Sequence, residues 1–234
     1  TVAHALNNIG SALADDGQMR GFELPEQSLA LALEHNLHDH ASRAYRNASE
    51  ASVRNRLLAQ AEALLVPGIA FARAHDMDQH ALGLVGALVQ VRLMQRRLDE
   101  AQTLSREALQ GESATSSTTH ITVATVAGTV AMLQDPGADA AALHAHWDAA
   151  LASQEPDRIV PLALGLAEAA WLRGDDARCA ALVQAALQAC AELTLWDRGE
   201  LACWLQRAVH DAHDMAEAAV AEPCRLELDG DLAA

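Results

Sequence analysis

The sequence predicts an all-α protein, a right-handed α-α superhelix of about six helix pairs. A helix-pair pattern recurs about every 39 residues, first around Leu6-Asn7-Asn8-Ile9-Gly10 and then in degenerate copies. Of the 234 residues, 51% are hydrophobic and only 3% are aromatic, so small residues, above all alanine, must provide most of the packing. β-branched runs long enough for strands are scarce. Together these observations favour helices throughout the chain.

The helices are placed by apolar residues that recur at helical spacing between turn residues such as Gly17 and Pro136-Gly137. The first helix of each pair is expected at 2–16, 40–54, 78–95, 118–134, 157–173 and 196–210, and the second helices fill the intervals. The expected N-caps, whose side-chain oxygens can accept a hydrogen bond from a free backbone N–H group, are Asp39, Asp78, Ser117 and Asp157.

Two domain segments are expected. Residues 1–210 form the helical repeats. Residues 211–234 form an irregular connection and the start of a further, truncated helix pair, with a short helix at 223–228. The chain opens at Thr1 without a methionine and stops in what reads as the beginning of another helix, which we interpret as a segment of a longer protein.

The repeats resemble tetratricopeptide repeats. Small or turn-facing residues align at Gly10, Ser49, Gly86 and Gly128, as expected where the second helix of a pair crosses the first. The period exceeds the one typical of that family, so the interpretation is a tetratricopeptide-like repeat with lengthened helices. HEAT-like pairs are the alternative.

Four segments make the resemblance more specific: HALNNIGSAL (4–13), EAAWLRGD (168–175), WDRGELACWLQR (196–207) and EPCRLELDGD (222–231). They look like the helical-repeat region of large ATP-dependent LuxR-type bacterial transcriptional regulators and related multidomain ATPases. The resemblance implies a sensor or coupling arm that binds an inducer or an inhibitory protein and relays this to the ATPase. In the family, a nucleotide-binding module precedes the repeats and a helix-turn-helix domain often follows, and neither set of motifs occurs in this sequence.

Charge and composition exclude several function classes. The chain has 16 Lys+Arg against 32 Asp+Glu, a net charge of −16, which repels a phosphate backbone, so we expect no direct nucleic acid contact. Every one of the 16 cations is an arginine, so a phosphate loop ending in Lys-Ser/Thr and Schiff-base chemistry are both excluded. Motifs of serine hydrolases and zinc proteases are also missing. We therefore expect no catalysis and no cofactor.

The apolar stretches fall short of the roughly 20 residues that a membrane helix needs, so no span is expected. The four cysteines, Cys179, Cys190, Cys203 and Cys224, show no Cys-x-x-Cys spacing and sit among apolar helical residues. This usage fits a protein of the reducing cytoplasm.

A candidate binding groove follows from the tetratricopeptide comparison, in which the first helix of each pair lines the concave face. The second pair contributes Arg43, Arg46, Glu50 and Arg54, which fall within about an 80° arc of one helix. This stripe could bind a carboxylate or phosphate. The neighbouring first helices are expected to add His4, Asn7, His80, Gln90, Thr122 and Thr125. The alternative is a solvated face in which Arg46–Glu50 and Glu50–Arg54 pairs contribute tenths of a kcal/mol.

Metal binding is suggested by 11 histidines, several of which recur at equivalent turns, as His35 and His75 do, and His40 and His80. The repeat accounts for this recurrence, and no His-x-x-x-His or Cys-x-x-Cys spacing supports a site. We expect no metal.

The function predicted from these observations is a non-catalytic effector- or partner-binding arm of a multidomain bacterial regulator. The ligand in the groove would be a small molecule, a protein or a peptide, and other domains of the parent protein would be further partners. The alternative is a pure protein-interaction or oligomerisation scaffold without a small-molecule ligand. Repeats that lack caps at both ends could also pair as a homodimer.

Overall fold

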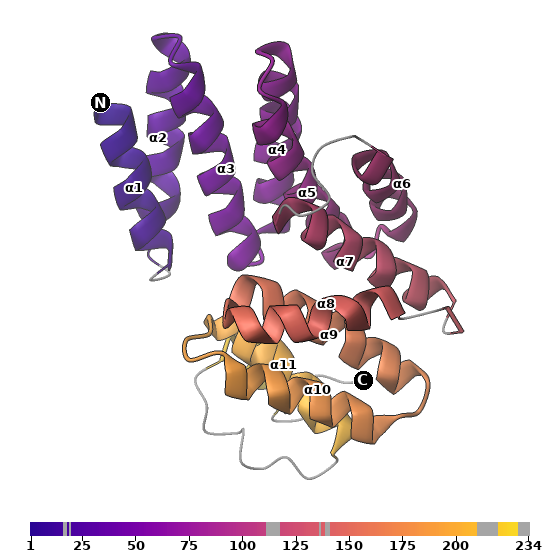
Figure 1. Cartoon of the computed structure of the whole chain (residues 1–234). Coiled ribbons are helices and arrows are strands. Elements are labelled where there is room, and N and C mark those ends of the chain that lie inside the picture. The colour runs from indigo at the N-terminus through magenta and orange to yellow at the C-terminus, as the bar shows by residue number, and fades with distance from the viewer. Residues whose placement is uncertain are drawn as a thin grey trace. The chain divides into compact units, whose positions relative to one another are not determined.

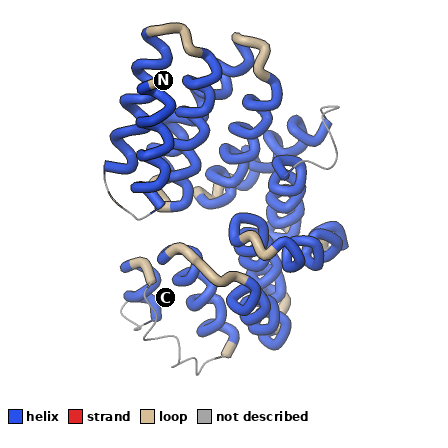
Figure 2. Tube along the Cα trace, turned by 60° about the vertical axis from the view of Figure 1, so that its left-hand side comes forward, coloured by secondary structure: helices blue, strands red, loops and turns tan. Residues whose placement is uncertain are grey.

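The computed structural model describes residues 1–15, 18, 20–110, 118–135, 137–138, 141–209 and 220–228. In these residues the chain forms twelve helices and no strand, which confirms the predicted all-α helical-repeat class (Figure 2). No helix in this part of the chain is long and apolar enough to cross a membrane.

The chain divides into two compact units, Thr1–Val123 and Ala124–Ala234. The first contains α1 (Val2–Asp15), α2 (Arg20–Glu34), α3 (His38–Arg54), α4 (Leu58–Ala74), α5 (Asp78–Met94) and α6 (Leu98–Gln110) (Figure 1). Helix α7 (Thr118–Gln134) contributes to both units. The second unit continues with α8 (Ala141–Ser153), α9 (Pro156–Leu172), α10 (Asp176–Ala189), α11 (Leu195–Ala208) and α12 (Glu222–Leu228).

Each consecutive pair from α1 to α6 packs together, and the first helices of the pairs also contact each other, α1 with α3 and α3 with α5. The first helices of all six pairs begin and end within two residues of the predicted positions. The predicted segment 211–219 lies outside the described residues, and the short helix expected at 223–228 is α12.

The helices of the first unit are joined by one repeated turn. Its central residue has a positive φ of 54° to 58° and recurs at a constant interval, at Asn36, Arg56, Asp76 and Arg96. In each turn the following N–H donates to a carbonyl five residues earlier, as Leu37 N does to Ala32 O at 2.8 Å and Met77 N to Ala72 O at 2.9 Å. This is the Schellman arrangement, which satisfies the last carbonyls of a helix. One helix and one turn therefore make the basic unit, and two such units make the helix pair.

The predicted caps at Asp39, Asp78 and Asp157 are wrong. The N-cap positions are Leu37 for α3, Met77 for α5 and Glu155 for α9, none of which makes a side-chain cap, and the three aspartates lie in the first helical turns. The Schellman turns before α3 and α5 leave a single residue before the next helix, and it is apolar. An aspartate in the first turn still favours the helix through its dipole. Ser117 lies outside the described residues.

Small residues fill the interior of the first unit, as the composition indicates. Buried alanines recur with the interval of the turns, one per helix, at Ala41, Ala61, Ala81 and Ala101. Close approach is visible between α1 and α2, where the Ser28 hydroxyl donates to the carbonyl oxygen of Ala3 at 2.7 Å. The helix axes can be near each other because these positions carry so little side chain.

The second unit has an apolar core centred on α9. Ile159, Leu162 and Leu166 of α9 are at most 2% exposed and belong to one cluster with side chains of α8, α10 and α11. Trp147 of α8 belongs to the same cluster and is 7% exposed. The cluster combines these bulky side chains with alanines such as Ala163 and Ala167.

Candidate functional site

The arginine stripe of α3 lies on the solvent-facing side of the helix. Arg43, Arg46 and Glu50 are exposed, and Arg54 is half-buried. Nε of Arg46 lies 3.7 Å from Oε1 of Glu50, and about half of each side chain is exposed. The other side of α3 carries alanines and serines that are buried. Because an ion pair so exposed contributes at most tenths of a kcal/mol, the stripe adds little to the stability of the fold.

Two contacts place the neighbouring first helices beside this stripe. The rings of His4 on α1 and His40 on α3 have centroids 5.9 Å apart. The Ser42 hydroxyl of α3 lies 2.8 Å from Nδ1 of His80 on α5. The predicted residues His4 and His80, both half-buried, are therefore held on α1 and α5 at the two borders with α3.

Burial defines which positions of the three helices are equivalent. The buried series Ala3, Asn7, Gly10 and Ala14 of α1 matches, position by position, Ala41, Tyr45, Ala48 and Ser52 of α3. The register from α3 to α5 is shown in the same way by Ala41 with Ala81 and by Tyr45 with Val85. Gly10 is therefore equivalent to Ala48. The predicted alignment of Gly10 with Ser49 is one position out of register, because small residues occupy both neighbouring positions of α3. Gly86, predicted to align with Ser49 as well, is equivalent to Arg46 and so was three positions out.

With this register, the stripe has neutral neighbours on both sides. The positions equivalent to Arg43, Arg46 and Glu50 are Ala5, Asn8 and Ala12 on α1, and Gly83, Gly86 and Gln90 on α5. The three α1 residues are exposed, and a Cβ atom built on Gly83 would have no neighbour within 4 Å. Gly86 is buried, and its Cβ would lie 2.9 Å from Thr119 of α7. The two guanidinium groups thus stand on a surface without a competing carboxylate at the equivalent positions.

Such a pair suits oxyanions. Arg43 and Arg46 are three residues apart, so their side chains leave the same face of α3. Each guanidinium is always charged and can donate two parallel hydrogen bonds to a carboxylate or phosphate. Glu50 lies one turn after Arg46 and pairs with it, and the exposed Asp39 lies one turn before Arg43, so an anion has to bind between these two carboxylates.

Two predicted site residues are buried, so they are not exposed to a ligand in this structure. Asn7 is 3% exposed because it occupies the position of Tyr45, which faces the interior of the helix layer. Its Oδ1 atom has no hydrogen-bond partner among the described residues. Thr125 is 6% exposed. Aligning Gly10 with Ser49 instead of Ala48 made Asn7 the equivalent of the exposed Arg46, whereas its true equivalent is the buried Tyr45.

The remaining predicted residues are half-buried. Gln90 occupies on α5 the position of Glu50 on α3. Thr122 lies on α7 and belongs to the first unit, whereas Thr125, on the same helix, belongs to the second. Of the predicted set, the structure therefore places on three adjacent helices, outside the buried positions, Arg43, Arg46, Glu50, Arg54, His4, His80 and Gln90.

Two histidines of the turns, His38 and His75, pack against each other and against Phe71. His38 and His75 have ring centroids 4.0 Å apart, and the ring of His75 also lies 4.3 Å from that of Phe71. His75 Nδ1 is 2.8 Å from the Phe71 carbonyl oxygen. Among the described residues, no group of three or more His, Cys, Asp or Glu side chains is placed to hold a metal ion. Aromatic packing is thus the interaction that brings His38 and His75 together.

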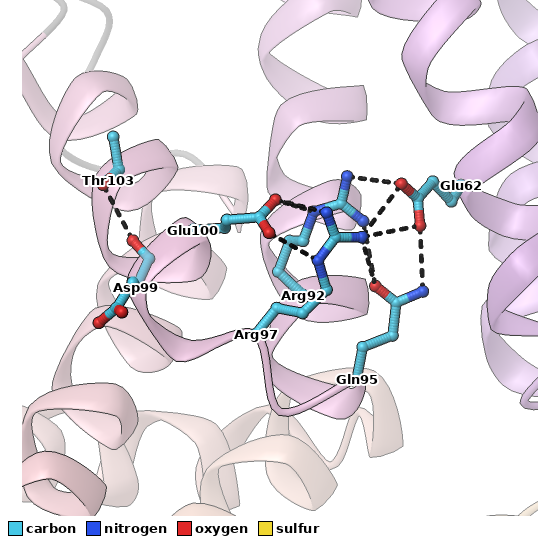
Figure 3. A network of polar contacts seen from close by, with 7 residues as sticks. All are labelled: Glu62, Arg92, Gln95, Arg97, Asp99, Glu100 and Thr103. Carbon is cyan, nitrogen blue, oxygen red and sulfur yellow. Dashed lines mark hydrogen bonds and ion pairs between the residues drawn. The ribbon is translucent and has the colours of Figure 1, made fainter.

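An ionic junction around one buried arginine joins helices of the first unit, and the sequence analysis missed it (Figure 3). Arg92 of α5 is 6% exposed. Its Nη2 donates to Oε1 of Glu62 on α4 at 2.7 Å, and its Nε lies 3.1 Å from Oε2 of Glu100 on α6. Arg97, in the turn before α6, donates to both oxygens of Glu100 at 2.7 Å. The junction therefore ties three helices together.

Gln95 completes the junction on the α4 side. Arg92 Nη1 donates to Gln95 Oε1 at 3.0 Å, and Gln95 Nε2 donates to Glu62 Oε2 at 3.1 Å. These bonds to Arg92 and Gln95 hold the pKa of Glu62 at about 2, well below its usual value. The hydrogen bonds to Glu100 raise the pKa of Arg97. Glu62 and Arg97 are therefore charged at neutral pH, and their ion pairs hold α4, α5 and α6 together.

One sequence signal could have identified Arg92. In the register of the repeated turns it occupies the position of Ala32, Ser52 and Ala72, all of which are buried. An unpaired buried charge is strongly destabilising. An arginine at a position that otherwise takes only small residues therefore indicates that carboxylate or other acceptor groups lie next to it. Because the turns recur at a constant interval, Arg92 can be recognised as equivalent to Ala72, Ser52 and Ala32.

The cysteines of the second unit are free and buried. Burial raises the pKa of the Cys179 thiol to about 11 and that of Cys203 to about 12. A thiol with so high a pKa is protonated at neutral pH and is a poor nucleophile. These side chains act as small apolar residues of the core.

The comparisons with known proteins give no relative: no family model, no curated protein and no solved structure matches this chain. The functional argument therefore depends on the residues themselves.

Proposed function

We propose that this chain is a non-catalytic binding module that takes an acidic group of an effector or partner protein at Arg43 and Arg46. The observation that carries the proposal is the exposed arginine pair of α3, which has only neutral residues at the equivalent positions of α1 and α5. The two arginines contribute little to the stability of the fold, because the described ion pair between Arg46 and Glu50 is exposed.

The electrostatics limit the kind of ligand. The chain has a net charge of −16, so an extended polyanion would be repelled by most of the surface. At physiological salt, charges are screened beyond about 8 Å, so a compact acidic group at Arg43 and Arg46 interacts mainly with the local arginines. A carboxylate cluster of a peptide or domain, or a small organic acid, meets this condition better than a nucleic acid.

The setting of the pair favours a protein or peptide as the source of that group. Arg43 and Arg46 stand on the open surface of a helix, where a neighbouring domain or an acidic peptide can reach both. The resemblance of the sequence to LuxR-type regulators leads us to place the module in the cytoplasm as the sensor or coupling arm of a multidomain bacterial protein, with the helix pairs wound as a right-handed superhelix. Binding would act by favouring one arrangement of the module relative to its neighbours over another.

A second candidate is an oligomerisation scaffold. It is favoured by Val2 and Ile9 on α1, large apolar side chains that are 69% and 53% exposed. In this case the arginine stripe would be a solvated face.

The proposal is tested by a thermal-shift screen with citrate, inorganic phosphate, a nucleotide, a sugar and an oligoglutamate peptide. A ligand present at 100 times its Kd stabilises the native state by about 2.7 kcal/mol, which is readily detected. We expect the oligoglutamate peptide or citrate to raise the Tm of the wild type, and the double variant Arg43→Gln/Arg46→Gln to lose the shift.

A matched control removes two other exposed arginines, Arg106→Gln/Arg178→Gln, and so changes the net charge equally. This control should keep the shift. Binding that survives in Arg43→Gln/Arg46→Gln, or that is lost equally in the control, would exclude the α3 stripe as the site. If no probe shifts the Tm of the wild type, the scaffold function is favoured.

A further inference from the structure

An exposed tryptophan near the end of α9 lies beside a second tryptophan on α11. Trp171 is 41% exposed and Trp204 is half-buried, and the centroids of their rings are 5.8 Å apart at an interplanar angle of 67°. Helix α9 packs against α8, α10 and α11, and it lies inside the second unit (Figure 1). The ring of Trp171 is therefore exposed on a helix that is already packed against three others.

The packing of the fold does not require a tryptophan at this position. Trp171 lies three residues before the positive-φ residue of the next turn, and Val53 of α3 and Leu93 of α5 occupy the same position. Val53 is only 8% exposed, so an aliphatic side chain fills the space that the position offers. The larger indole of Trp171 extends into solvent instead. Tryptophan is enriched at binding surfaces, so this ring is a candidate contact for a ligand.

The tryptophan pair already holds one cation. The guanidinium carbon of Arg207 lies over the ring of Trp204, 4.5 Å from its centroid, which is within the range of a cation–π interaction. Arg207 also forms an ion pair with Glu227 of α12 at 2.7 Å, so its charge is compensated inside the unit. A guanidinium group thus fits this aromatic surface, and the neighbouring ring of Trp171 offers a second surface of the same kind.

Two glutamates add negative charge beside the rings. Glu168 precedes Trp171 by three residues on α9, and Glu200 precedes Trp204 by four residues on α11. These spacings place each carboxylate on the same face of its helix as the tryptophan. The chain as a whole has a net charge of −16, so its field also attracts a cation. Aromatic rings and carboxylates together suit arginine, whose planar guanidinium stacks on a ring and donates hydrogen bonds to carboxylates.

We propose that Trp171, Trp204, Glu168 and Glu200 form a binding site for an arginine side chain of a partner protein. The guanidinium stacks on the exposed ring of Trp171, beside Trp204, and its N–H groups face the two carboxylates. A protein is the source of the arginine because the ring stands on the outer surface of a helix, which a side chain projecting from another protein can reach. The site belongs to the second unit and takes a cation, so it is independent of the anion site proposed on α3.

An NMR titration of the indole N–H signals tests the proposal, with the peptide acetyl-Gly-Arg-Gly-amide as the probe. The chain has four tryptophans, and Trp→Phe variants assign their signals. We expect the peptide to shift the signals of Trp171 and Trp204 in a saturable way and to leave that of the buried Trp147 unchanged. The matched peptide contains citrulline, which has the shape of arginine without its charge, and should bind at least about fivefold more weakly.

The variant Trp171→Leu removes the exposed ring and gives α9 the side chain that α5 carries at the equivalent position, Leu93. The fold should therefore be kept, which far-ultraviolet circular dichroism checks. We expect this variant to bind the arginine peptide about fivefold more weakly, as read from the signal of Trp204. An unchanged affinity would overturn the proposal.

The contribution of the carboxylates is tested by Glu168→Gln/Glu200→Gln, which should also weaken binding of the arginine peptide. The control Glu192→Gln/Glu222→Gln removes two exposed glutamates of the same unit, changes the net charge equally and should keep the affinity. An equal loss in both double variants would show general attraction to an acidic chain and overturn the proposal. Equal binding of the arginine and citrulline peptides would indicate a site for an uncharged group and overturn it as well. So would the absence of any shift at about 20 mM arginine peptide.

Discussion

The two units share a turn and differ in what their helices enclose. In the first, positive-φ turns recur at a constant interval from Asn36 to Arg96, and the helices enclose alanines, branched apolar side chains such as Leu65 and Leu84, and the buried Arg92. In the second, Gln154 and Gly174 keep the same spacing, but the core is built from branched apolar side chains and cysteines. The difference teaches that one local turn can support an interior that includes a buried arginine as well as one built from apolar side chains and cysteines. It also predicts that the first unit is the more sensitive to the loss of a charge.

The largest effect is expected at the ionic junction of the first unit. Glu62→Leu removes one of the two carboxylates beside the buried Arg92, and we expect it to lower the free energy of unfolding by about 3 kcal/mol, because a buried charge loses its partner. Urea unfolding followed by circular dichroism measures this. The double variant Glu62→Leu/Arg92→Met removes the buried charge as well and should lose less than the single variant. A loss below about 0.5 kcal/mol for Glu62→Leu would show that the junction does not stabilise the unit.

Acid should weaken the first unit through the same residue. The pKa of Glu62 is lowered in the folded state to about 2, so its contribution is complete above the unfolded value near 4.5 and is lost as the pH falls towards 2. We expect the contribution to be about 2 kcal/mol at neutral pH, since part of the side chain is in water. The difference in unfolding free energy between wild type and Glu62→Gln, measured from pH 6 to pH 2, should shrink in this range. A difference that does not change with pH would contradict the assignment.

Added volume should destabilise where a glycine is closely packed and not where it faces open space, and Gly165 and Gly83 form a contrasting pair. Gly165 of α9 lies against Thr129, so that a Cβ would overlap the hydroxyl and lie 3.1 Å from Cγ2. We expect Gly165→Ala to destabilise by about 1 to 2 kcal/mol through overpacking. The double variant Gly165→Ala/Thr129→Ala should recover part of this loss. Gly83→Ala in α5 meets open space and should stabilise by about 0.5 to 1 kcal/mol, because alanine favours a helix over glycine.

Thermal unfolding of Gly165→Ala, Gly165→Ala/Thr129→Ala and Gly83→Ala measures whether each substitution lowers or raises the Tm. Destabilisation by Gly83→Ala, or no effect of Gly165→Ala, would contradict the packing described for the respective helix.

The smallest effect is expected at the exposed pair of the stripe. Glu50→Gln removes the partner of Arg46 at a position where both side chains are about half exposed, and the unfolding free energy should change by no more than about 0.5 kcal/mol. Urea unfolding of this variant beside Glu62→Leu compares an exposed with a buried carboxylate in one unit. A loss comparable to that of Glu62→Leu would show that the stripe is part of the structural framework.

Much of this architecture could be predicted from the sequence, and the exceptions have physical reasons. The first helices were placed within two residues because a helical apolar period is a strong signal, and the same spacing put Arg43 and Arg46 on one face. Asn7 was misplaced because alanine, glycine and serine are so common that two neighbouring registers of α1 against α3 look alike. The turn residues Arg56 and Arg96 have a positive φ that residue type does not indicate.

The junction was missed for another reason. Its members come from α4, α5, the following turn and α6, so no short motif contains them, and Glu62 and Arg92 are 30 residues apart.

The central claim is that the stripe of α3 binds and does not stabilise, while the junction stabilises and does not bind. The most direct test is calorimetric titration of an oligoglutamate peptide into the wild type and into Arg43→Gln/Arg46→Gln, with urea unfolding of the same samples. We predict that the double variant loses binding at least tenfold, about 1.4 kcal/mol, while its unfolding free energy stays within about 0.5 kcal/mol of the wild type. Unchanged affinity, or a loss of binding that is matched by a loss of stability, would contradict the claim.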